Sequence, residues 1–323
     1  MENRLFGSSS PHIRSDETSS TIMRDVLIAL LPATLASIYF FRLSAVMLIA
    51  VSIGGAVIAE FVSQKIMKRK TTIGDLSAIV TGLLVAMNIP ASAPWWIALI
   101  GSAFAIVICK QMFGGIGNNF INPALAARAF LLASWPVIMT TWTSPGPDAM
   151  TTATPLAILK PGGEAAGEAL PSLFNAFIGN IGGSLGETSA LLLIIGAIYL
   201  FARGVINWRA PFTFIGTVAV CTGIYAFTGL DANAPAIGLE FVMYQMVSGG
   251  LMLGAFFMAT DYSSSPITPK GKIIFGIGCG LITSIIRLYG GYPEGVSYSI
   301  LLMNVATPLI DKYTSPKVFG EVK

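Results

Sequence analysis

Charged residues are scarce in this chain. Asp, Glu, Lys and Arg together make up 11% of its 323 residues, while 54% of the residues are hydrophobic. Soluble globular domains carry roughly 25% charged residues. So little charge cannot cover a water-exposed surface of this size, and the mean hydropathy of +0.74 fits a chain solvated by membrane lipid. The net charge is only +3, so nucleic acid is not expected as a partner.

Residues that bind metals are also few. The cysteines Cys109, Cys221 and Cys279 form no CxxC pair, and each lies in an apolar run, which is typical of small buried side chains. His12 is the only histidine. We therefore expect no zinc, haem or iron–sulfur centre in this chain.

A cleavable signal peptide is missing as well. The first 20 residues are polar and lack a basic stretch followed by a short apolar core and a small-residue cleavage site. The first hydrophobic span is therefore expected to stay in the mature protein.

Long apolar runs dominate the rest of the chain. A transmembrane helix needs about 20 apolar residues, and the sequence predicts about ten such spans, two of which, 74–89 and 239–259, read as short or broken. The predicted spans are 24–41, 44–65, 74–89, 94–112, 122–141, 188–204, 211–229, 239–259, 272–290 and 295–311. The predicted fold class is thus an all-α polytopic membrane protein.

The basic residues predict the orientation, because short cytoplasmic loops are enriched in Lys and Arg. With ten spans and a cytoplasmic N-terminus, all of the lysines and arginines except Arg42, Arg128, Lys160 and Arg287 lie in or next to cytoplasmic segments. We expect both termini inside and the long segment 142–187 outside. The predicted parts are a cytoplasmic segment 1–23, a first membrane repeat 24–141, the outer loop 142–187, a second membrane repeat 188–311 and a cytoplasmic tail 312–323.

The two halves of the chain resemble each other. TGLL at 81–84 and GG at 114–115 are matched by SGGL at 248–251 and GG at 290–291. With five spans in each half, the second half would enter the membrane from the opposite side, which predicts an inverted five-plus-five repeat with broken helices at matching positions. Glycine pairs are also common where membrane helices pack closely, so packing alone is the alternative explanation.

A few polar residues fall within or beside the spans. Asp75 and Asp261 lie on the two spans predicted to be broken, and Arg128 lies inside another. Ionisable groups at membrane depth tend to face a site or a water-filled cavity, so these three are candidates for a membrane site. Glu60 and Glu240 are predicted to be plain interfacial caps.

The glycine-rich stretch GGIGNN at 114–119 does not fit a dinucleotide fingerprint, because no acidic residue follows about 20 positions later. It is predicted to be a hinge before a half-helix that begins at Asn122 and Pro123. The N–H groups there could face an anionic group, so Asn122 is a fourth candidate for the membrane site. A tight turn with a capping Asn is the alternative.

The long outer segment contains the stretch DAMTTATP at 148–155. By itself, a Thr-rich stretch that closes on Thr-Pro is typical of a turn. This one resembles the flavinylation motif Asp-x-x-(Ser/Thr)-Gly-Ala-Thr of the RnfD/NqrB family. Thr152 stands where that family usually has glycine.

The resemblance extends along almost the whole chain, in the same order. It includes SSSPHI at 8–13, MRDV at 23–26, ALLP at 29–32, GGIGNN at 114–119, NPA at 122–124, RAF at 128–130, MATD at 258–261, SP at 265–266, TPKG at 268–271, IR at 286–287 and GGYPEG at 290–295. The length and the N-terminal start favour the RnfD branch.

The resemblance implies a flavin-carrying membrane subunit of an Rnf-type complex, in which electrons pass between ferredoxin and NAD while Na+ or H+ crosses the bacterial cytoplasmic membrane. It implies that a flavin transferase esterifies FMN to Thr154, with Asp148 and Thr151 as recognition positions. A noncovalent riboflavin is also implied, and the remaining redox centres would lie on partner subunits.

A small-solute channel or secondary transporter without flavin is the alternative function. The repeat and the broken helices fit it equally well. The two hypotheses differ in the outer segment, since a transporter has no use for the flavinylation motif.

Overall fold

The computed structural model describes residues 17–146, 150–160, 169–187, 189–228 and 236–316, and within these ranges it contains helices and no strand beyond isolated bridges. The first half of the chain forms α1 (Ser19–Ile66), α2 (Ser77–Met87), α3 (Trp95–Ile106) with the π-helical turn η2 (Val107–Gln111), α4 (Pro123–Ser134) and α5 (Pro136–Thr140). The second half forms α8 (Ala190–Ala202), α9 (Arg209–Thr228), α10 (Leu239–Val247), α11 (Leu251–Leu253) with the π-helical turn η4 (Gly254–Met258), α12 (Pro269–Tyr289) and α13 (Val296–Thr314). Between the halves lie α6 (Pro155–Leu159), α7 (Leu173–Ile178) and the 3₁₀ turn η3 (Leu185–Glu187), while the 3₁₀ turn η1 (Ile73–Asp75) precedes α2.

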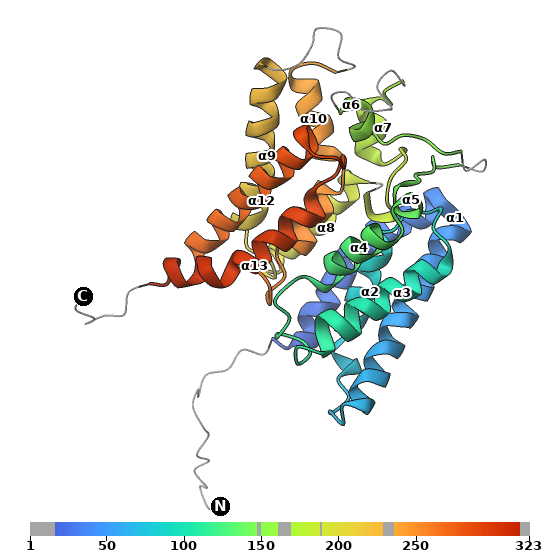
Figure 1. The fold of residues 1–323 in the computed structure, drawn as a ribbon, viewed down its shortest axis with the longest axis vertical. Helices are drawn as coiled ribbons and strands as arrows, with labels where there is room; N and C mark the ends of the chain where they lie inside the picture. The colour runs from blue at the N-terminus through green and yellow to red at the C-terminus, as the bar shows by residue number, and fades with distance from the viewer. Residues whose placement is uncertain (1–16, 147–149, 161–168, 188, 229–235, 317–323) are drawn as a thin grey trace, which may run out of the picture.

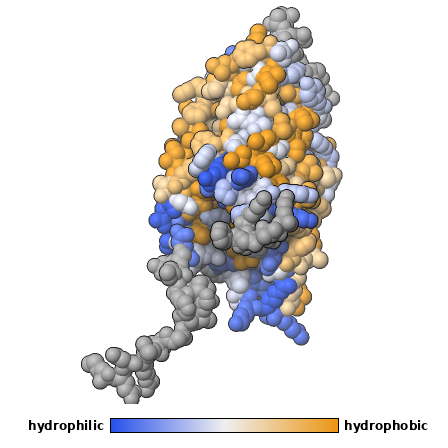
Figure 2. Space-filling model, turned by 90° about the vertical axis from the view of Figure 1, so that its left-hand side faces the viewer, coloured by the Kyte–Doolittle hydropathy of each residue, from blue (hydrophilic) through white to orange (hydrophobic). Residues whose placement is uncertain are grey.

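Three helices, α1, α9 and α12, are long and apolar enough to cross a bilayer. The pair formed by α10 and the segment Leu251–Met258 passes the same test as one span bent by 59°. The helices α2, α3 with η2, α4 and α8 are apolar but shorter. Many large hydrophobic side chains are exposed on the helices, and hydrophobic residues cover most of the face seen in Figure 2. Together, the long apolar helices and the hydrophobic surface define a helical membrane protein.

The gap predicted between the spans 24–41 and 44–65 coincides with a break inside α1 at Arg42, whose φ of 51° and ψ of −126° are not helical. Two other spans predicted from sequence need correction. The span predicted at 74–89 contains a helix of only 11 residues, α2. The span predicted at 122–141 is divided into α4 and α5, because Pro136 begins a new helix.

The glycine match between the halves also holds only in part. Gly249 and Gly250 have φ of +72° and +66° and lie at the break after α10, whereas Gly82 lies inside α2. A Cβ on Gly82 would lie 2.8 Å from the Ile53 Cα, so the small residue there allows α2 to pack closely on α1. The two motifs therefore have different roles, close packing in the first half and a helix break in the second.

The helices of each half of the chain form a bundle, and the two bundles pack their helices in the same order. In the first, α1 contacts α2 and α3, and α3 contacts α4; in the second, α9 contacts α10 and α12, and α12 contacts α13. The bundles lie side by side in Figure 1, joined by contacts of α1 with α8 and of α4 with α13.

The segment before α8 packs between the two bundles. The Leu185 N–H donates to the Ile89 carbonyl just after α2 (3.1 Å), and the Ser37 hydroxyl of α1 donates to the Leu185 carbonyl (2.6 Å). Glu187 accepts a hydrogen bond from the Gly249 N–H at the break after α10. This part of the segment 142–187 is therefore held in the helical core.

Arg287 of α12 stabilises the same break. Its buried guanidinium donates to the carbonyls of Gln245, Ser248 and Gly249. Irregular backbone at membrane depth requires such partners, because lipid cannot satisfy free carbonyls. The charge of Arg287 thus has a structural role at the bent span.

Candidate functional site

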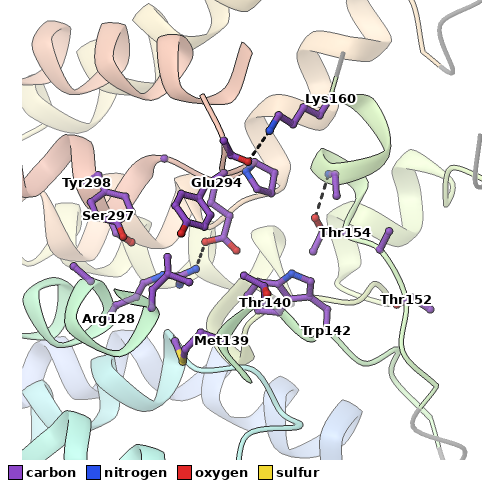
Figure 3. Close-up of a pocket in the computed structure, with 18 residues that line it drawn as sticks. Arg128, Met139, Thr140, Trp142, Thr152, Thr154, Lys160, Glu294, Ser297 and Tyr298 are labelled. Atoms are coloured by element: carbon purple, nitrogen blue, oxygen red, sulfur yellow. Dashed lines mark hydrogen bonds and ion pairs between the residues drawn. The ribbon is translucent and has the colours of Figure 1, made fainter. Parts of the chain in front are cut away.

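A cavity of about 540 Å³ lies beside α4, between the segment around α6 and the start of α13. Figure 3 shows side chains from these elements pointing into one space. The lining residues are Arg128, Ala129, Leu132, Met139, Thr140, Trp142, Thr152, Ala153, Thr154, Ala157, Lys160, Gly291, Tyr292, Pro293, Glu294, Gly295, Ser297 and Tyr298. Its volume falls within the roughly 300–1,000 Å³ of typical small-molecule pockets.

Thr154 is held at this cavity by the helix that follows it. Its Oγ1 accepts a hydrogen bond from the Ala157 N–H (3.2 Å) as the N-cap of α6, and Pro155 occupies the first helical position. Leu156 and Ile158 are buried and anchor this short helix in the core. Thr154 itself is only 1% exposed, so its hydroxyl has one fixed position.

The other motif residues differ in their surroundings. Thr151 is exposed and forms an isolated antiparallel bridge with Thr143. Thr152 also lines the cavity, and its backbone N–H donates to the Trp142 carbonyl (3.0 Å). Asp148 lies outside the described residues.

A buried ion pair lies across the cavity from Thr154 (Figure 3). The Arg128 guanidinium bonds to the Glu294 carboxylate, and the two side chains are 8% and 16% exposed. Arg128 also donates to the backbone carbonyl (3.2 Å) and the side-chain oxygen (3.0 Å) of Asn88, just after α2. Arg128 therefore links the end of α2 to the loop before α13.

Aromatic and basic side chains complete the lining. The rings of Tyr292 and Tyr298 are nearly parallel, at 26°, with centroids 6.3 Å apart. The Lys160 ammonium donates to the Gly291 carbonyl (2.6 Å). Two cations and one carboxylate thus face a space that is otherwise largely apolar and aromatic, a chemistry suited to a flat, anionic ligand.

Asn122 and Asp261 do not face this cavity. They line a second, smaller cavity of about 110 Å³, together with Ser77, Lys110 and Asn119. Asn122 is the N-cap of α4, where its side chain accepts from the N–H groups of Ala124 and Leu125, and it also donates to the Met258 carbonyl (3.2 Å) at the end of η4. Asn122 therefore caps the helix that begins at Pro123, so the predicted half-helix and the predicted capping Asn describe the same helix start.

Asp261 follows η4 and is held by polar neighbours. Its carboxylate accepts from the Ser264 hydroxyl (2.9 Å), the Asn119 amide (3.3 Å) and the Ser263 N–H (3.5 Å). Burial raises the pKa of the Asp261 carboxyl, while these three hydrogen bonds lower it. The side chain is only partly buried.

Asp75 and Glu60 lie close to the second cavity. Asp75 accepts hydrogen bonds from the backbone and hydroxyl of Ser77. The Ser77 hydroxyl also accepts from Lys110 (2.6 Å), whose ammonium lies 3.0 Å from both oxygens of Glu60. The prediction that Glu60 is an interfacial cap is wrong, since Glu60 is 1% exposed and forms this buried ion pair. Glu240, in contrast, is exposed in the first turn of α10.

The structure thus divides the predicted residues between two cavities. Thr154 and Arg128 share the larger one, whereas Asn122 and Asp261 share the smaller one with Asp75 nearby. Glu294, Trp142 and Tyr298 were not predicted as site residues. The signal for Glu294 was the stretch GGYPEG at 290–295.

A helical membrane protein with a largely apolar, charge-bearing cavity beside a capped threonine is the class that the fold and the site define. Comparison with known families identifies it further: the chain belongs to the NQR2, RnfD, RnfE family, whose model matches residues 7–320.

Several curated relatives match almost the entire chain. The chain is 54% identical to the D subunit of the Na(+)-translocating ferredoxin:NAD(+) oxidoreductase complex of Acetobacterium woodii, over 100% of this chain and 97% of the relative. It is 47% identical to the D subunit of the proton-translocating ferredoxin:NAD(+) oxidoreductase complex of Clostridium ljungdahlii, over 97% and 95% of the two chains. It is 37% identical to the D subunit of the ion-translocating oxidoreductase complex of Halorhodospira halophila, over 97% and 95%.

Proposed function

We propose that this chain is the RnfD-type membrane subunit of an Rnf-type complex, which couples electron transfer between ferredoxin and NAD to ion translocation across the bacterial cytoplasmic membrane. The carrying observation is the full-length match, at 54% and 47% identity, to the corresponding subunits of two ferredoxin:NAD(+) oxidoreductase complexes. The names of these two relatives specify different ions, Na+ and H+, so the proposal covers both. The chain acts as one part of a translocase, with the centres that meet ferredoxin and NAD on partner subunits.

Within this complex, Thr154 carries FMN through a phosphoester bond to its side-chain oxygen. Three features of the cavity fit the group. Thr154 lines the cavity, the volume of about 540 Å³ suits a ligand of this class, and a buried Glu294 oxygen has no hydrogen-bond partner among the described residues. The motif roles of Asp148 and Thr151 rest on the family resemblance.

The flavin supplies the electron chemistry, and the protein supplies binding and electrostatics. Thr154 would supply the attachment point, and its position is set by the N-cap hydrogen bond that its oxygen accepts from the Ala157 N–H. Lys160, the residue directly after α6, would provide a cation at the cavity. Trp142 and Tyr298 line the cavity and would present aromatic surface to the ring and limit the entry of water. The family resemblance also implies riboflavin. The second cavity, at about 110 Å³, is smaller than typical ligand pockets, so we assign riboflavin no position.

The proposed architecture is ten spans in an inverted five-plus-five repeat, with the five parts predicted from sequence. The break at Arg42 supports it, because the 48 residues of α1 would extend about 72 Å as one straight helix, more than twice the ~30 Å bilayer core. Divided at Arg42, α1 supplies two spans. Each half then has five members. In the first half they are the two parts of α1, α2, α3 and α4, and in the second they are α8, α9, the bent pair of α10 and α11, α12 and α13.

The orientation can be tested by labelling single cysteines in sealed cells. Cys109, Cys221 and Cys279 are first replaced by alanine, and cysteine is then placed at Met150 or at Lys70, both exposed. A membrane-impermeant maleimide should label Met150→Cys in intact cells and Lys70→Cys only after permeabilisation, because the basic segment is expected inside. Labelling of both from one side would contradict the ten-span arrangement.

The function is tested by making the wild-type chain with and without a flavin transferase. We expect a fluorescent band on a denaturing gel only with active transferase, and a peptide mass increased by one FMN in the segment 150–160. The chain made with an inactive transferase is the matched control. If no adduct forms with the active enzyme, the small-solute transporter becomes the better hypothesis, because it needs the repeat but not the flavin.

A further inference from the structure

One acceptor atom in the larger cavity has no donor. The carboxylate of Glu294 bonds to Arg128 through Oε2, while its Oε1 is buried and without a hydrogen-bond partner among the described residues. A buried acceptor that has lost water is destabilising unless a donor meets it. The orphaned Oε1 and the pair's place in the wall of the Thr154 cavity indicate that a ligand supplies the donor.

The ion pair presents both kinds of hydrogen-bonding group. Arg128 offers N–H donors and Glu294 offers an acceptor. The pyrimidine edge of an isoalloxazine carries one N–H between two carbonyl oxygens, which is the complementary pattern. The opposite, dimethylbenzene end of the ring has no such groups, so the pair distinguishes the two ends.

We propose that Arg128 and Glu294 bind the pyrimidine edge of the flavin attached at Thr154, with Glu294 Oε1 accepting from the ring N–H and Arg128 donating to an adjacent ring carbonyl. This inference rests on the proposed function, since it requires the flavin on Thr154. Lys160 is the other cation in the wall and is already bonded to the Gly291 carbonyl. The side chains of Leu132, Met139 and Trp142 provide the apolar surface for the remainder of the ring.

The binding has an electrostatic consequence that can be measured. When dithionite transfers two electrons to the flavin, and water supplies the protons, electron density on the ring increases. The Arg128 cation stabilises that density and the Glu294 carboxylate opposes it. Neutralising the two residues should therefore shift the flavin midpoint potential in opposite directions, which a general loss of structure would not do.

The test uses the full-length chain made with active flavin transferase and purified in detergent. Acid precipitation separates the covalent flavin, which stays with the protein, from any noncovalent flavin, which is measured in the supernatant. Arg128→Gln should lower the reduced-to-oxidised ratio about tenfold at a fixed potential, equivalent to about 30 mV for a two-electron couple. Glu294→Gln should raise the ratio by a similar factor. Arg128→Lys, which keeps the charge, should stay close to wild type. In-gel fluorescence should show unchanged covalent flavin in all three.

The ion pair between Arg203 and Asp25 supplies the control, because it joins an arginine to an aspartate at 3.1 Å and does not line this cavity. Arg203→Gln and Asp25→Asn should leave the potential unchanged. Shifts of the same sign at Arg128 and Glu294, or shifts no larger than these controls, would overturn the inference. If Arg128→Gln does not fold because Asn88 loses its donor, the sign at Glu294→Gln decides alone. Absence of covalent flavin in the wild type would instead contradict the proposed function.

Discussion

Replacing Thr154 with valine should abolish covalent flavin completely. The phosphoester needs a side-chain oxygen, and valine keeps the β-branched shape while removing that oxygen. The N-cap bond to the Ala157 N–H is lost as well, at a cost of about 1 kcal/mol, which is too small to prevent folding of a chain with so large a buried core. In-gel fluorescence and the mass of the peptide from this segment should both show no adduct.

Two further variants sharpen this experiment, one that keeps the hydroxyl at position 154 and one that removes a neighbouring hydroxyl. Thr154→Ser keeps both the oxygen and the cap, and it should keep the flavin. Thr151→Val removes an exposed hydroxyl three residues earlier, and it should retain some or all of the flavin. If Thr154→Val still carries FMN in this segment, Thr151 or Thr152 is the acceptor and the assignment is wrong.

The burial of Thr154 has a further consequence for maturation. At 1% exposure, the side chain offers no surface to an enzyme. The transferase must therefore act before α6 packs against the core, or after the first turn of α6 opens. Helix α6 has only five residues, and such short helices have little stability apart from their tertiary contacts.

Lys110→Met should destabilise the protein by about 3–5 kcal/mol, because it leaves a buried carboxylate without its counter-ion. Glu60 is 1% exposed, and Lys110 lies 3.0 Å from both of its oxygens. The amides of Gln64 and Gln111 also donate to Glu60, at 3.1 and 2.8 Å, but they carry no charge. The midpoint of thermal unfolding in detergent, followed by size-exclusion chromatography, should fall sharply.

The double variant Glu60→Gln, Lys110→Met should recover most of that loss, since no uncompensated charge remains. Arg203→Met supplies the comparison: Arg203 is 49% exposed and its partner Asp25 is 5% exposed, so water reaches one side of this pair, and its loss should cost less than the loss of Lys110, which is 4% exposed. Equal effects of Lys110→Met and Arg203→Met would contradict the prediction that the buried Glu60 carboxylate depends on Lys110.

Composition and local pattern were sufficient for the class of protein and for the helix start at Asn122. A chain with 11% charged residues has too little polar surface for water, and apolar runs in lipid must form helices to satisfy their own backbone. Asn122-Pro123 begins α4 as predicted, because the cap and the proline act within one turn. Thr154-Pro155, which by itself is typical of a turn, also begins a helix. The family likewise followed from short motifs in a fixed order.

Span lengths were less predictable, because hydropathy counts apolar residues but does not detect where a helix ends inside an apolar run. The predicted gap between 41 and 44 coincides with the break at Arg42, but the predicted span 74–89 contains a helix of only 11 residues. The different roles of Gly82 and Gly249 were not predictable either, since one glycine meets a neighbouring helix and the other turns the chain.

The sequence by itself determined the lipid solvent, the helical class and the threonine in the flavinylation motif. Only the tertiary structure decided which charges meet. It placed Glu294 beside Arg128, 166 positions away, and Lys110 beside Glu60, 50 positions away. In a membrane protein these pairings are set by helix packing, because a charge excluded from lipid is stable only where another element brings it a partner. The sequence next to each of these four residues does not indicate which residue is its partner.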